Sequence, residues 1–438
     1  MIQKLKFDFI QFSEKIIREN FIISLKIYIK FFKRNNVPQK KTISVINTYD
    51  ISGGAAKIAY TISDEIRHLI PLQYFVKEKK TNESWIVQVG ERVYNFFEEN
   101  LKREANEKGW IEFAGFHSLN LLNNSFFSQS NIIHIHNLHG DFFSPALFNI
   151  LLQRKRVIWT LHDESFITGH CSCTLGCERW KKGCGECPDL GIYPSVKFDN
   201  TFNVLKYKKK WINELQPIVV CPSFWLAERV KVAYPKLNRV EVIPNGIDTK
   251  IFYPRDKEHA RKKLSLPLGC KMVLFVAEFA TNNPFKGGEI LRELISDSDF
   301  SELVFVTVGG NQYERISNHI SYPYISDEEE LALLYSASDI LLYPTQADNL
   351  PLVVLESMAC RTPVIASRLG GIPEIINATN GFLVDSYKMS SSFKSKLVHF
   401  LAFEKEELDS ISTQAMLTIK TQFSFESMIR SYLKIYEI

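Results

Sequence analysis

The chain carries a predicted anion site within residues 340–367. Residues 340–343 form an apolar run typical of a buried strand, a polar loop follows, and a helical pattern begins at Pro351. Proline suits the first turn of a helix because its missing N–H would have no partner there. The amides of Leu352 and Val353 would then point out of the helix start, where backbone amides attract anions.

Two carboxylates flank this helix start. Asp348 precedes it and Glu356 lies within the helix, with seven residues between them. Carboxylates accept hydrogen bonds from sugar hydroxyls. An anion site between two hydroxyl acceptors indicates a nucleotide-sugar pocket; the alternative is a plain strand–helix–strand unit whose acids are solvated.

The same stretch resembles a known motif. Asp348, the run Glu-Ser-Met-Ala-Cys from residue 356 and the run Thr-Pro-Val-Ile-Ala from residue 362 are similar to the donor-site signature of family 4 retaining glycosyltransferases. That family has the GT-B fold, an α/β architecture of two Rossmann-like domains whose parallel sheets face a cleft. Where the family usually has Glu-Gly-Phe-Gly, this chain has Asp348, Asn349, Leu350 and Pro351. The resemblance implies that Asn349 and Leu350 contact the nucleotide sugar.

Chain length predicts two domains. A chain of 438 residues is too long for one ordinary core and suits two domains of roughly 200 residues each. Together with the resemblance, this predicts four segments: a basic amphipathic extension (1–41), an N-terminal Rossmann-like acceptor domain (42–250), a C-terminal Rossmann-like nucleotide-sugar domain (251–421) and a C-terminal helix that returns to the first domain (422–438).

Composition argues against several other classes. The hydrophobic fraction of 45% is that of a globular protein, and the sequence has no run of about 18 apolar residues that would predict a membrane-spanning helix. The N-terminus lacks the apolar core and cleavage site of a signal peptide, so we expect a cytoplasmic location. The net charge is only +4, with +7 on residues 1–41 and −3 on the rest, so nucleic acid is not an expected partner.

The basic N-terminal segment has helical periodicity. Apolar side chains recur at Ile22, Leu25, Ile29 and Phe32, while lysines and an arginine occupy another face. Such a helix can lie in a membrane surface, which would place the protein at the inner face of the membrane. The alternative is that residues 1–40 pack on the protein's own body or on a second subunit, or form a poorly ordered extension.

Paired glycines mark the first predicted strand–helix turn. Gly53 and Gly54 follow an apolar strand pattern at residues 43–48 and precede a helical pattern. Glycines let a backbone approach another group closely. The turn is not G-x-G-x-x-G, which argues against a nicotinamide or flavin enzyme. In the resembling family this loop faces the cleft and can contact the donor phosphate or the acceptor.

Histidines follow two further predicted strands. His134 and His136 lie on one face of a strand by period 2, which is typical of satisfied structural residues, and His139 falls in the loop beyond, where it would face the cleft. His162 and Asp163 come directly after an apolar strand, where open parallel sheets bind ligands. His162 matches the histidine that family members place next to the donor sugar, which implies sugar positioning or proton handling. Asp163 would orient it or cap the next helix.

A cysteine cluster follows His162, within a predicted insertion at residues 170–190. The spacing of Cys171, Cys177, Cys184 and Cys187 resembles a cluster in the colanic-acid-type subset of the family. Four thiolates ending in C-x-x-C suit tetrahedral zinc, and a cytoplasmic chain seldom keeps disulfides. We expect a structural zinc site with no catalytic role. The alternative is free or paired cysteines without metal, because the spacing is not that of a standard zinc finger.

The second predicted domain offers a diphosphate ligand. Lys286 precedes Gly287 and Gly288 at a helix start, where the cation, the backbone amides and the helix dipole all favour negative charge. Most family members also carry an arginine soon after the preceding strand, but this chain has Glu278 there. In addition, Ile325 lies in a segment that resembles the family's base-recognition element, and the residues after it would cap the following helix.

With the resemblance, these residues predict a metal-independent, retaining glycosyltransferase of the hexosyltransferase type that uses a UDP- or GDP-sugar. Lys286, Leu352 and Val353 would stabilise the departing nucleoside diphosphate, Glu356 would bind the ribose and Asp348 the donor sugar. The expected acceptor is a polysaccharide or a lipid-linked saccharide. Two alternatives remain: a catalytically silent GT-B partner protein, and a GT-B epimerase or phosphorylase.

Overall fold

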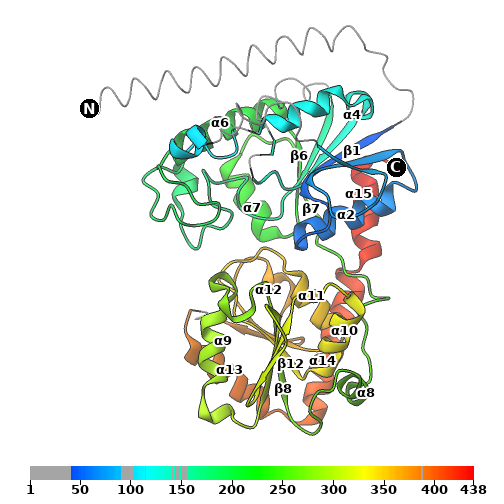
Figure 1. Cartoon of the computed structure of the whole chain (residues 1–438), viewed down its shortest axis with the longest axis vertical. Helices are drawn as coiled ribbons and strands as arrows, with labels where there is room; N and C mark the ends of the chain where they lie inside the picture. Colours follow the sequence, from blue (N-terminus) through cyan, green and yellow to red (C-terminus); the bar gives the residue numbers. More distant parts are fainter. Residues whose placement is uncertain are drawn as a thin grey trace. The chain divides into compact units, whose positions relative to one another are not determined.

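The computed structural model describes residues 41–89, 103–113, 115–140, 142–143, 148, 155–385 and 388–438. The amphipathic helix predicted within residues 1–40 therefore lies outside the described residues. The chain divides into two compact units (Figure 1). Unit 1 extends to Cys221 and adds Ala227–Val242 and Tyr436–Ile438, whereas unit 2 comprises Pro222–Leu226 and Ile243–Ile435.

Unit 1 is built on a parallel sheet. Among the described residues, its strands lie in the order β3-β2-β1-β4-β5-β6-β7, and every neighbouring pair is parallel. The bounds of these strands are β1 Ile43–Tyr49, β2 Leu72–Glu78, β3 Ile86–Gln88, β4 Ile132–Ile135, β5 Arg156–Thr160, β6 Ile218–Cys221 and β7 Val240–Val242. The unit's helical elements are α2 Gly54–Ile66, η1 Phe116–Asn123, α4 Ser125–Gln129, η2 Arg179–Lys182 and α6 Thr201–Leu215, and α7 Phe224–Ala233 begins in unit 2 and ends in unit 1.

Alternation along the strands of unit 1 supplies two apolar faces. Ile46, Ile133 and Ile135 pack with Phe127 of α4 in one core, which Trp211 of α6 also contacts. On the other strand face, α2 packs against β1 and β2. His134 alternates with Ile133 and Ile135 and therefore projects away from the first core, as the period-2 pattern predicts.

Unit 2 repeats the plan with a second sheet. Its described strands lie in the order β10-β11-β9-β8-β12-β13-β14, and only the β10–β11 pair is antiparallel. The strand bounds are β8 Met272–Val276, β9 Val304–Gly310, β10 Glu314–Ile316, β11 His319–Pro323, β12 Ile340–Tyr343, β13 Val364–Ser367 and β14 Phe382–Val384. The helical elements are α8 Lys257–Lys263, η3 Ala280–Asn282, η4 Pro284–Lys286, α9 Gly288–Ile295, η5 Ser298–Phe300, α10 Glu328–Ala337, α11 Leu352–Ala359, α12 Ile372–Ile375, α13 Ser390–Leu401, α14 Lys405–Gln422 and α15 Phe425–Tyr436.

Helices cover both faces of the second sheet. Leu341 and Tyr343 of β12 belong to the core that contains α10, α11 and α14, whereas Ile340 and Leu342 belong to the core that contains α9 and α13. Figure 1 shows α9 and α13 on one side of β8 and β12, and α8, α10 and α14 on the other. Strands buried on both faces read as continuous apolar runs, which is why residues 340–343 were recognisable in the sequence.

Each sheet has a point at which the strand order reverses. In unit 1 this point lies between β1 and β4, and in unit 2 it lies between β8 and β12. Doubly wound sheets bind ligands beyond the carboxyl ends of the strands at such points. The loops there carry Gly53 and His136 in unit 1, and Lys286 and Asp348 in unit 2. This arrangement confirms the predicted α/β fold with two Rossmann-like sheets.

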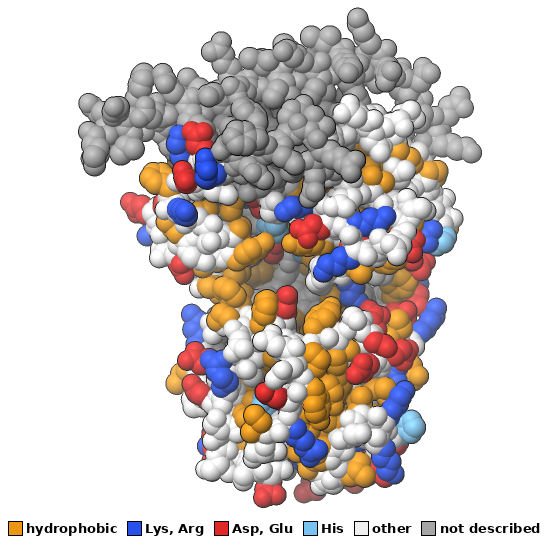
Figure 2. Space-filling model, in the orientation of Figure 1, with side chains coloured by type: hydrophobic (Ala, Val, Ile, Leu, Met, Phe, Trp, Pro, Cys, Tyr) orange, Lys and Arg blue, Asp and Glu red, His pale blue; other side chains and the backbone are white. Residues whose placement is uncertain are grey.

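No helix in the described part of the chain is both long enough and apolar enough to cross a membrane. On the face drawn in Figure 2, Lys and Arg side chains are interspersed with Asp and Glu side chains and do not gather by sign. The strongest concentration of one charge in the sequence, on residues 1–41, falls almost entirely outside the described residues.

Candidate active site

An ion pair lies at the reversal point of the second sheet. Lys286 ends η4 in the loop after β8, and Asp348 lies in the loop after β12. The Lys286 Nζ atom is 2.8 Å from Asp348 Oδ1 and 2.7 Å from Oδ2. The two residues meet because the sheet order places β8 beside β12. The structure thus joins the residues predicted to bind the diphosphate and the donor sugar.

Asp348 has two further polar partners. The Tyr343 hydroxyl donates to Asp348 Oδ2 at 2.7 Å, and Thr345 Oγ1 lies 2.7 Å from the same oxygen. Sequence reasoning missed Tyr343 and Thr345. Their positions could have identified them, because Tyr343 is the last residue of β12 and Thr345 follows it by two residues, at the edge of the sheet where ligands bind. A carboxylate with several donors is fixed in orientation, and its negative charge is stabilised.

Gly287 allows the Lys286 loop to approach the loop after β12. Its backbone has φ 75°, and a Cβ atom there would lie 2.0 Å from the carbonyl oxygen of Pro344. Any other residue would both strain this backbone and collide with Pro344. The glycine after Lys286 is therefore needed to bring the lysine to Asp348.

Helix α11 begins one residue later than predicted, with Pro351 as its N-cap. The amides of Leu352 and Val353 lie in its first turn and so have no partner within the helix. Glu356 lies further along the helix, is only 4% exposed, and accepts a hydrogen bond from the Tyr335 hydroxyl at 2.9 Å. A buried carboxylate needs such a donor, which fixes its orientation.

Asn349 and Leu350 have structural contacts. Asn349 Oδ1 accepts a hydrogen bond from Ser223 Oγ at 2.5 Å, and the Leu350 carbonyl accepts one from Asn245 Nδ2 at 3.0 Å. The Leu350 side chain is buried in the core of unit 2. Both residues fix the loop that carries Asp348. Asn349 Nδ2 is buried without a partner among the described residues.

The residues around the predicted base-recognition segment have different structural roles. Asp327 is the N-cap of α10 and accepts a hydrogen bond from the Glu329 amide at 2.8 Å, whereas Ser326 is exposed. Ile325 is half-buried and packs on the core. Glu278 is exposed at the end of β8, and Lys286 pairs with Asp348 instead of with this acid.

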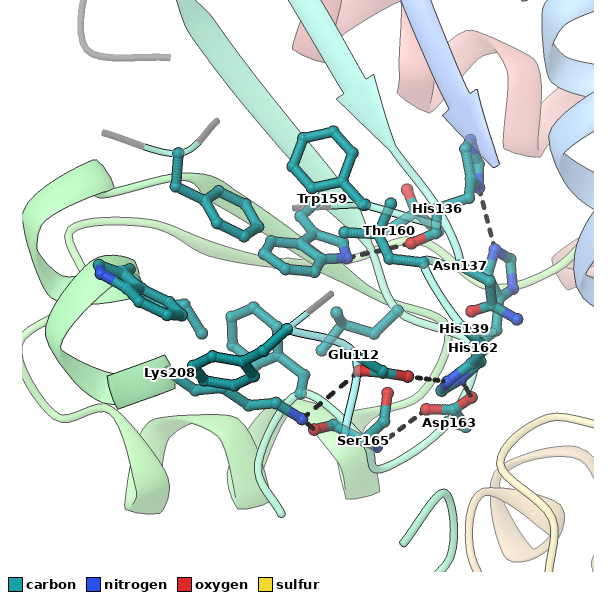
Figure 3. Close-up of a pocket in the computed structure, with 18 residues that line it drawn as sticks. Glu112, His136, Asn137, His139, Trp159, Thr160, His162, Asp163, Ser165 and Lys208 are labelled. Atoms are coloured by element: carbon teal, nitrogen blue, oxygen red, sulfur yellow. Dashed lines mark hydrogen bonds and ion pairs between the residues drawn. The ribbon is translucent and has the colours of Figure 1, made fainter. Parts of the chain in front are cut away.

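Unit 1 holds a second polar cluster, shown in Figure 3. His139 lies between two carboxylates, with Nδ1 2.8 Å from Glu112 Oε1 and Nε2 2.7 Å from Asp163 Oδ2. Burial opposes protonation of His139, but Asp163 and Glu112 outweigh it and raise the pKa of His139 well above its usual value. Burial likewise opposes ionisation of Asp163, yet contact with His139 lowers the pKa of Asp163 to about 2. The group is therefore an imidazolium between two carboxylates.

Asp163 plays neither of the roles expected from the sequence. Its Oδ2 binds His139 rather than His162, and its Oδ1 accepts a hydrogen bond from the Ser165 amide at 2.8 Å in the loop. Asp163 adjoins His162 in sequence, but its carboxylate contacts His139 in space. The His139 loop comes closer because β4 lies beside β5.

Three histidines, His134, His136 and His162, lie beside this cluster. His162 Nε2 lies 2.9 Å from His136 Nδ1, and His134 Nε2 lies 2.8 Å from Thr160 Oγ1. His134 Nδ1 also bonds the Tyr436 hydroxyl, so His134 is a satisfied structural residue. Burial lowers the pKa of His162 to about 4 and that of His134 to about 3, and it lowers the pKa of His136 as well. All three are neutral at pH 7.

Aromatic side chains form much of the wall of the cavity next to His162. Lys208 Nζ lies 3.9 Å from Glu112 Oε2 at its polar side. The aromatic residues that line the cavity are Phe113, Phe143, Phe148, Trp159, Phe166 and Trp211. Sequence reasoning missed Glu112, Lys208 and the lining role of these aromatics. Trp159 lies within β5, and the others come from segments without a recognisable strand-end motif.

Gly53 occupies the turn between β1 and α2. It is the N-cap of α2 with φ 84°, and a Cβ atom there would have nothing within 4 Å. Gly54 is the first residue of the helix. The positive φ requires glycine at 53, and the open space beside it leaves room for another molecule.

The four predicted zinc ligands line one small cavity. Cys171, Cys177, Cys184 and Cys187 all contribute to it, and His170 Nε2 lies 3.3 Å from Cys187 Sγ. The soft donor set fits zinc. Among the described residues, however, no three His, Cys, Asp or Glu side chains are close enough together to hold a metal ion as they stand. Zinc binding therefore stays a prediction.

Comparisons with known proteins agree with this geometry. Residues 256–416 match the family described as glycosyl transferases group 1. The colanic acid biosynthesis glycosyl transferase WcaC of Escherichia coli K12 is 24% identical over 323 residues, which are 70% of this chain and 76% of WcaC.

Two solved structures are similar in fold. Sucrose-phosphate synthase from Thermosynechococcus elongatus has a TM-score of 0.68 at 18% identity, over 91% of this chain and 98% of that one. Anabaena Alr3699/HepE in complex with UDP and glucose has a TM-score of 0.61 at 14% identity, over 91% of this chain and all of that one. These likenesses confirm the predicted GT-B fold. The chain therefore carries a glycosyl transferases group 1 domain on a GT-B fold.

Proposed function

We propose that the protein is a retaining glycosyltransferase of the hexosyltransferase type that uses a UDP- or GDP-sugar. One observation supports this most directly: Lys286 and Asp348 meet at the reversal point of the second sheet, and α11 begins four residues after Asp348. A cation, free helix amides and a carboxylate at one place suit a diphosphate attached to a sugar. UDP and glucose in the similar Anabaena structure support this ligand class.

In this proposal the difficult charge is that of the departing nucleoside diphosphate. Lys286 and the amides of Leu352 and Val353 stabilise it, because preorganised donors and cations act strongly where water is excluded. This charge supply allows a mechanism without a catalytic metal. When the phosphate takes Lys286, Asp348 keeps Tyr343 and Thr345 as partners and can accept from a sugar hydroxyl.

Glu356 and Ile325 would bind the nucleoside. The Tyr335 hydroxyl fixes one oxygen of Glu356, which orients the carboxylate toward ribose hydroxyls. The backbone of Ile325, just before α10, would contact the base. His162 would contact the donor sugar, and the loop at Gly53 and Gly54 would approach the phosphate or the acceptor.

The acceptor we propose is a saccharide, either a polysaccharide or a lipid-linked precursor. The similarity to a colanic acid biosynthesis transferase supports this class. The basic amphipathic pattern of residues 1–40 would suit contact with the inner face of a membrane, where a lipid-linked acceptor would be found.

A thermal-shift screen tests the nucleotide site. UDP, GDP and ADP, at about 100 times the dissociation constant, stabilise a protein by about 2.7 kcal/mol if they bind only its native state, which raises Tm by about 5–10 °C. We expect one base to give this shift in wild type. Glu356→Gln keeps an acceptor for Tyr335 but loses the charge, and should show a smaller shift.

The exposed residue Glu302 offers a matched control, and Glu302→Ala should retain the wild-type shift. A shift of equal size in Glu356→Gln would remove Glu356 from the site. Absence of any shift with all three nucleotides would contradict the donor pocket and favour a catalytically silent GT-B partner.

Metal analysis tests the cysteine cluster. If Cys171, Cys177, Cys184 and Cys187 hold a structural zinc, protein purified without chelator should contain about one zinc per chain. The double variant Cys184→Ser/Cys187→Ser should contain none and should unfold at a lower temperature, while Cys270→Ser, from unit 2, should keep the metal. Zinc-free wild-type protein that is fully folded would rule the zinc site out.

A further inference from the structure

We propose that His136 fixes the tautomer and orientation of His162, so that His162 presents an N–H at Nδ1 to the substrate. The sequence left two roles open for His162, sugar positioning and proton handling. The inference rests on the proposed function for its kinetic consequence only. The tautomer itself is a property of the folded protein and can be measured without substrate.

His136 is held rigidly by its backbone and by burial. Its amide donates to the Ile46 carbonyl at 2.9 Å, and its carbonyl accepts a hydrogen bond from Trp159 Nε1 at 3.1 Å. Its side chain is 1% exposed. His136 is therefore a fixed reference against which a neighbouring ring can be oriented.

The two rings of His136 and His162 share one hydrogen bond. The 2.9 Å distance joins His136 Nδ1 to His162 Nε2, and the rings are nearly parallel, with 19° between their planes (Figure 3). His136 Nε2 is buried and has no partner among the described residues. Only Nδ1 of His136 is thus engaged, which makes the pair asymmetric.

Two proton arrangements are compatible with this bond. In the first, His136 Nδ1–H donates to His162 Nε2, and His162 then carries its own proton on Nδ1. In the second, His162 Nε2–H donates to His136 Nδ1, and His136 must then carry its proton on the buried Nε2. Both arrangements keep each ring neutral, as the burial-lowered pKa values of both histidines require.

The first arrangement is favoured by what it leaves buried. The second leaves a buried N–H without an acceptor, and orphaned buried N–H groups are rarer in proteins than under-satisfied acceptors. The first leaves only a bare ring nitrogen at the same place. His162 is therefore assigned as the Nδ1–H tautomer.

This assignment restricts the chemical role of His162. A neutral imidazole whose Nε2 accepts from His136 cannot also accept a proton there, and its Nδ1–H can only donate. His162 would therefore donate to a sugar hydroxyl and would not act as a general base. The charged groups nearest to it, His139 and Asp163, are paired with each other, so neither takes its proton.

Nitrogen-15 spectra of histidine-labelled protein test the tautomer. Wild-type His162 should show the Nδ1–H pattern, against the usual Nε2–H preference of free imidazole, and His162→Gln identifies its resonances. His136→Leu removes the donor and should return His162 to the Nε2–H pattern. His136→Asn places an amide N–H near the former Nδ1 and should keep Nδ1–H. The exposed His259, removed in His259→Gln, is the control.

Steady-state kinetics provide the second test of the proposal. Loss of one neutral hydrogen bond predicts a fall in kcat of about 5- to 10-fold for His136→Leu, with KM for the donor nearly unchanged and most of the rate recovered in His136→Asn. A wild-type His162 in the Nε2–H form, or one that stays Nδ1–H in His136→Leu, would overturn the proposal. If the spectra show the expected tautomers but the protein transfers no sugar, the tautomer assignment stands and the proposed function is refuted.

Discussion

Lys286→Ala should lower kcat/KM for sugar transfer by about 10²- to 10³-fold, the usual effect of removing one preorganised electrostatic contact to a charge that develops in the transition state. Lys286 is the cation closest to Asp348 in the structure, with Nζ within 2.8 Å of both carboxylate oxygens. Without it, the diphosphate would lose its counter-charge and would also face the negative charge of Asp348. Steady-state kinetics with the nucleotide sugar chosen by the thermal-shift screen would measure the effect.

Two variants separate charge from folding. Lys286→Arg keeps the cation but not the compact ammonium geometry, so it should recover part of the loss. Lys263→Ala removes an exposed lysine from the same unit and should leave kcat/KM within twofold of wild type, or about 0.4 kcal/mol. Asp348 retains Tyr343 and Thr345 in Lys286→Ala, so the variant should fold. Unchanged turnover in a folded Lys286→Ala would exclude Lys286 from the active site.

The second-unit site was largely predictable because its residues follow strands. A buried parallel strand reads as an apolar run, and polar residues just after it fall at the ligand-binding edge of the sheet. This logic found Lys286 and Asp348. It did not show that they pair, because their contact depends on β8 lying beside β12, and strand order is not written in local periodicity.

The first-unit site was only half predictable for the same reason. His139 and His162 follow strands and were found, but Glu112 comes from a segment without a strand-end pattern. The Asp163 prediction failed because it relied on sequence neighbours, whereas the partner of Asp163 comes from the loop after β4. The helix start at Leu352 was displaced by one residue because Pro351 has extended backbone and caps the helix from outside.

Acidification from pH 7 to pH 5 should weaken unit 1 by several kcal/mol. His134, His136 and His162 have pKa values below the ordinary 6.5, so the unfolded chain binds protons that the fold excludes. Stability from a depressed histidine is complete above pH 6.5 and is lost as pH falls toward its folded pKa. For His162, with a folded pKa of about 4, the loss by pH 5 is about 2 kcal/mol.

The other titrating groups of this region do not mask the effect. The raised pKa of His139 gives stability that is complete below pH 6.5 and is lost only as pH rises above that value. Asp163, with a pKa of about 2, stays ionised in the fold, and unfolded carboxyls change little between pH 7 and pH 5. The slope in this window therefore belongs to the three neutral histidines.

Urea unfolding followed by tryptophan fluorescence would measure how the free energy of unfolding of unit 1 depends on pH. Five of the six tryptophans lie in unit 1, so the signal reports mainly its unfolding. His162→Gln should flatten the pH dependence, because glutamine cannot take up the proton that the unfolded histidine binds, whereas His259→Gln, from an exposed site in unit 2, should not. A free energy of unfolding that is constant from pH 7 to pH 5 would show that these histidines are not held neutral, which would also remove the basis for assigning a tautomer to His162.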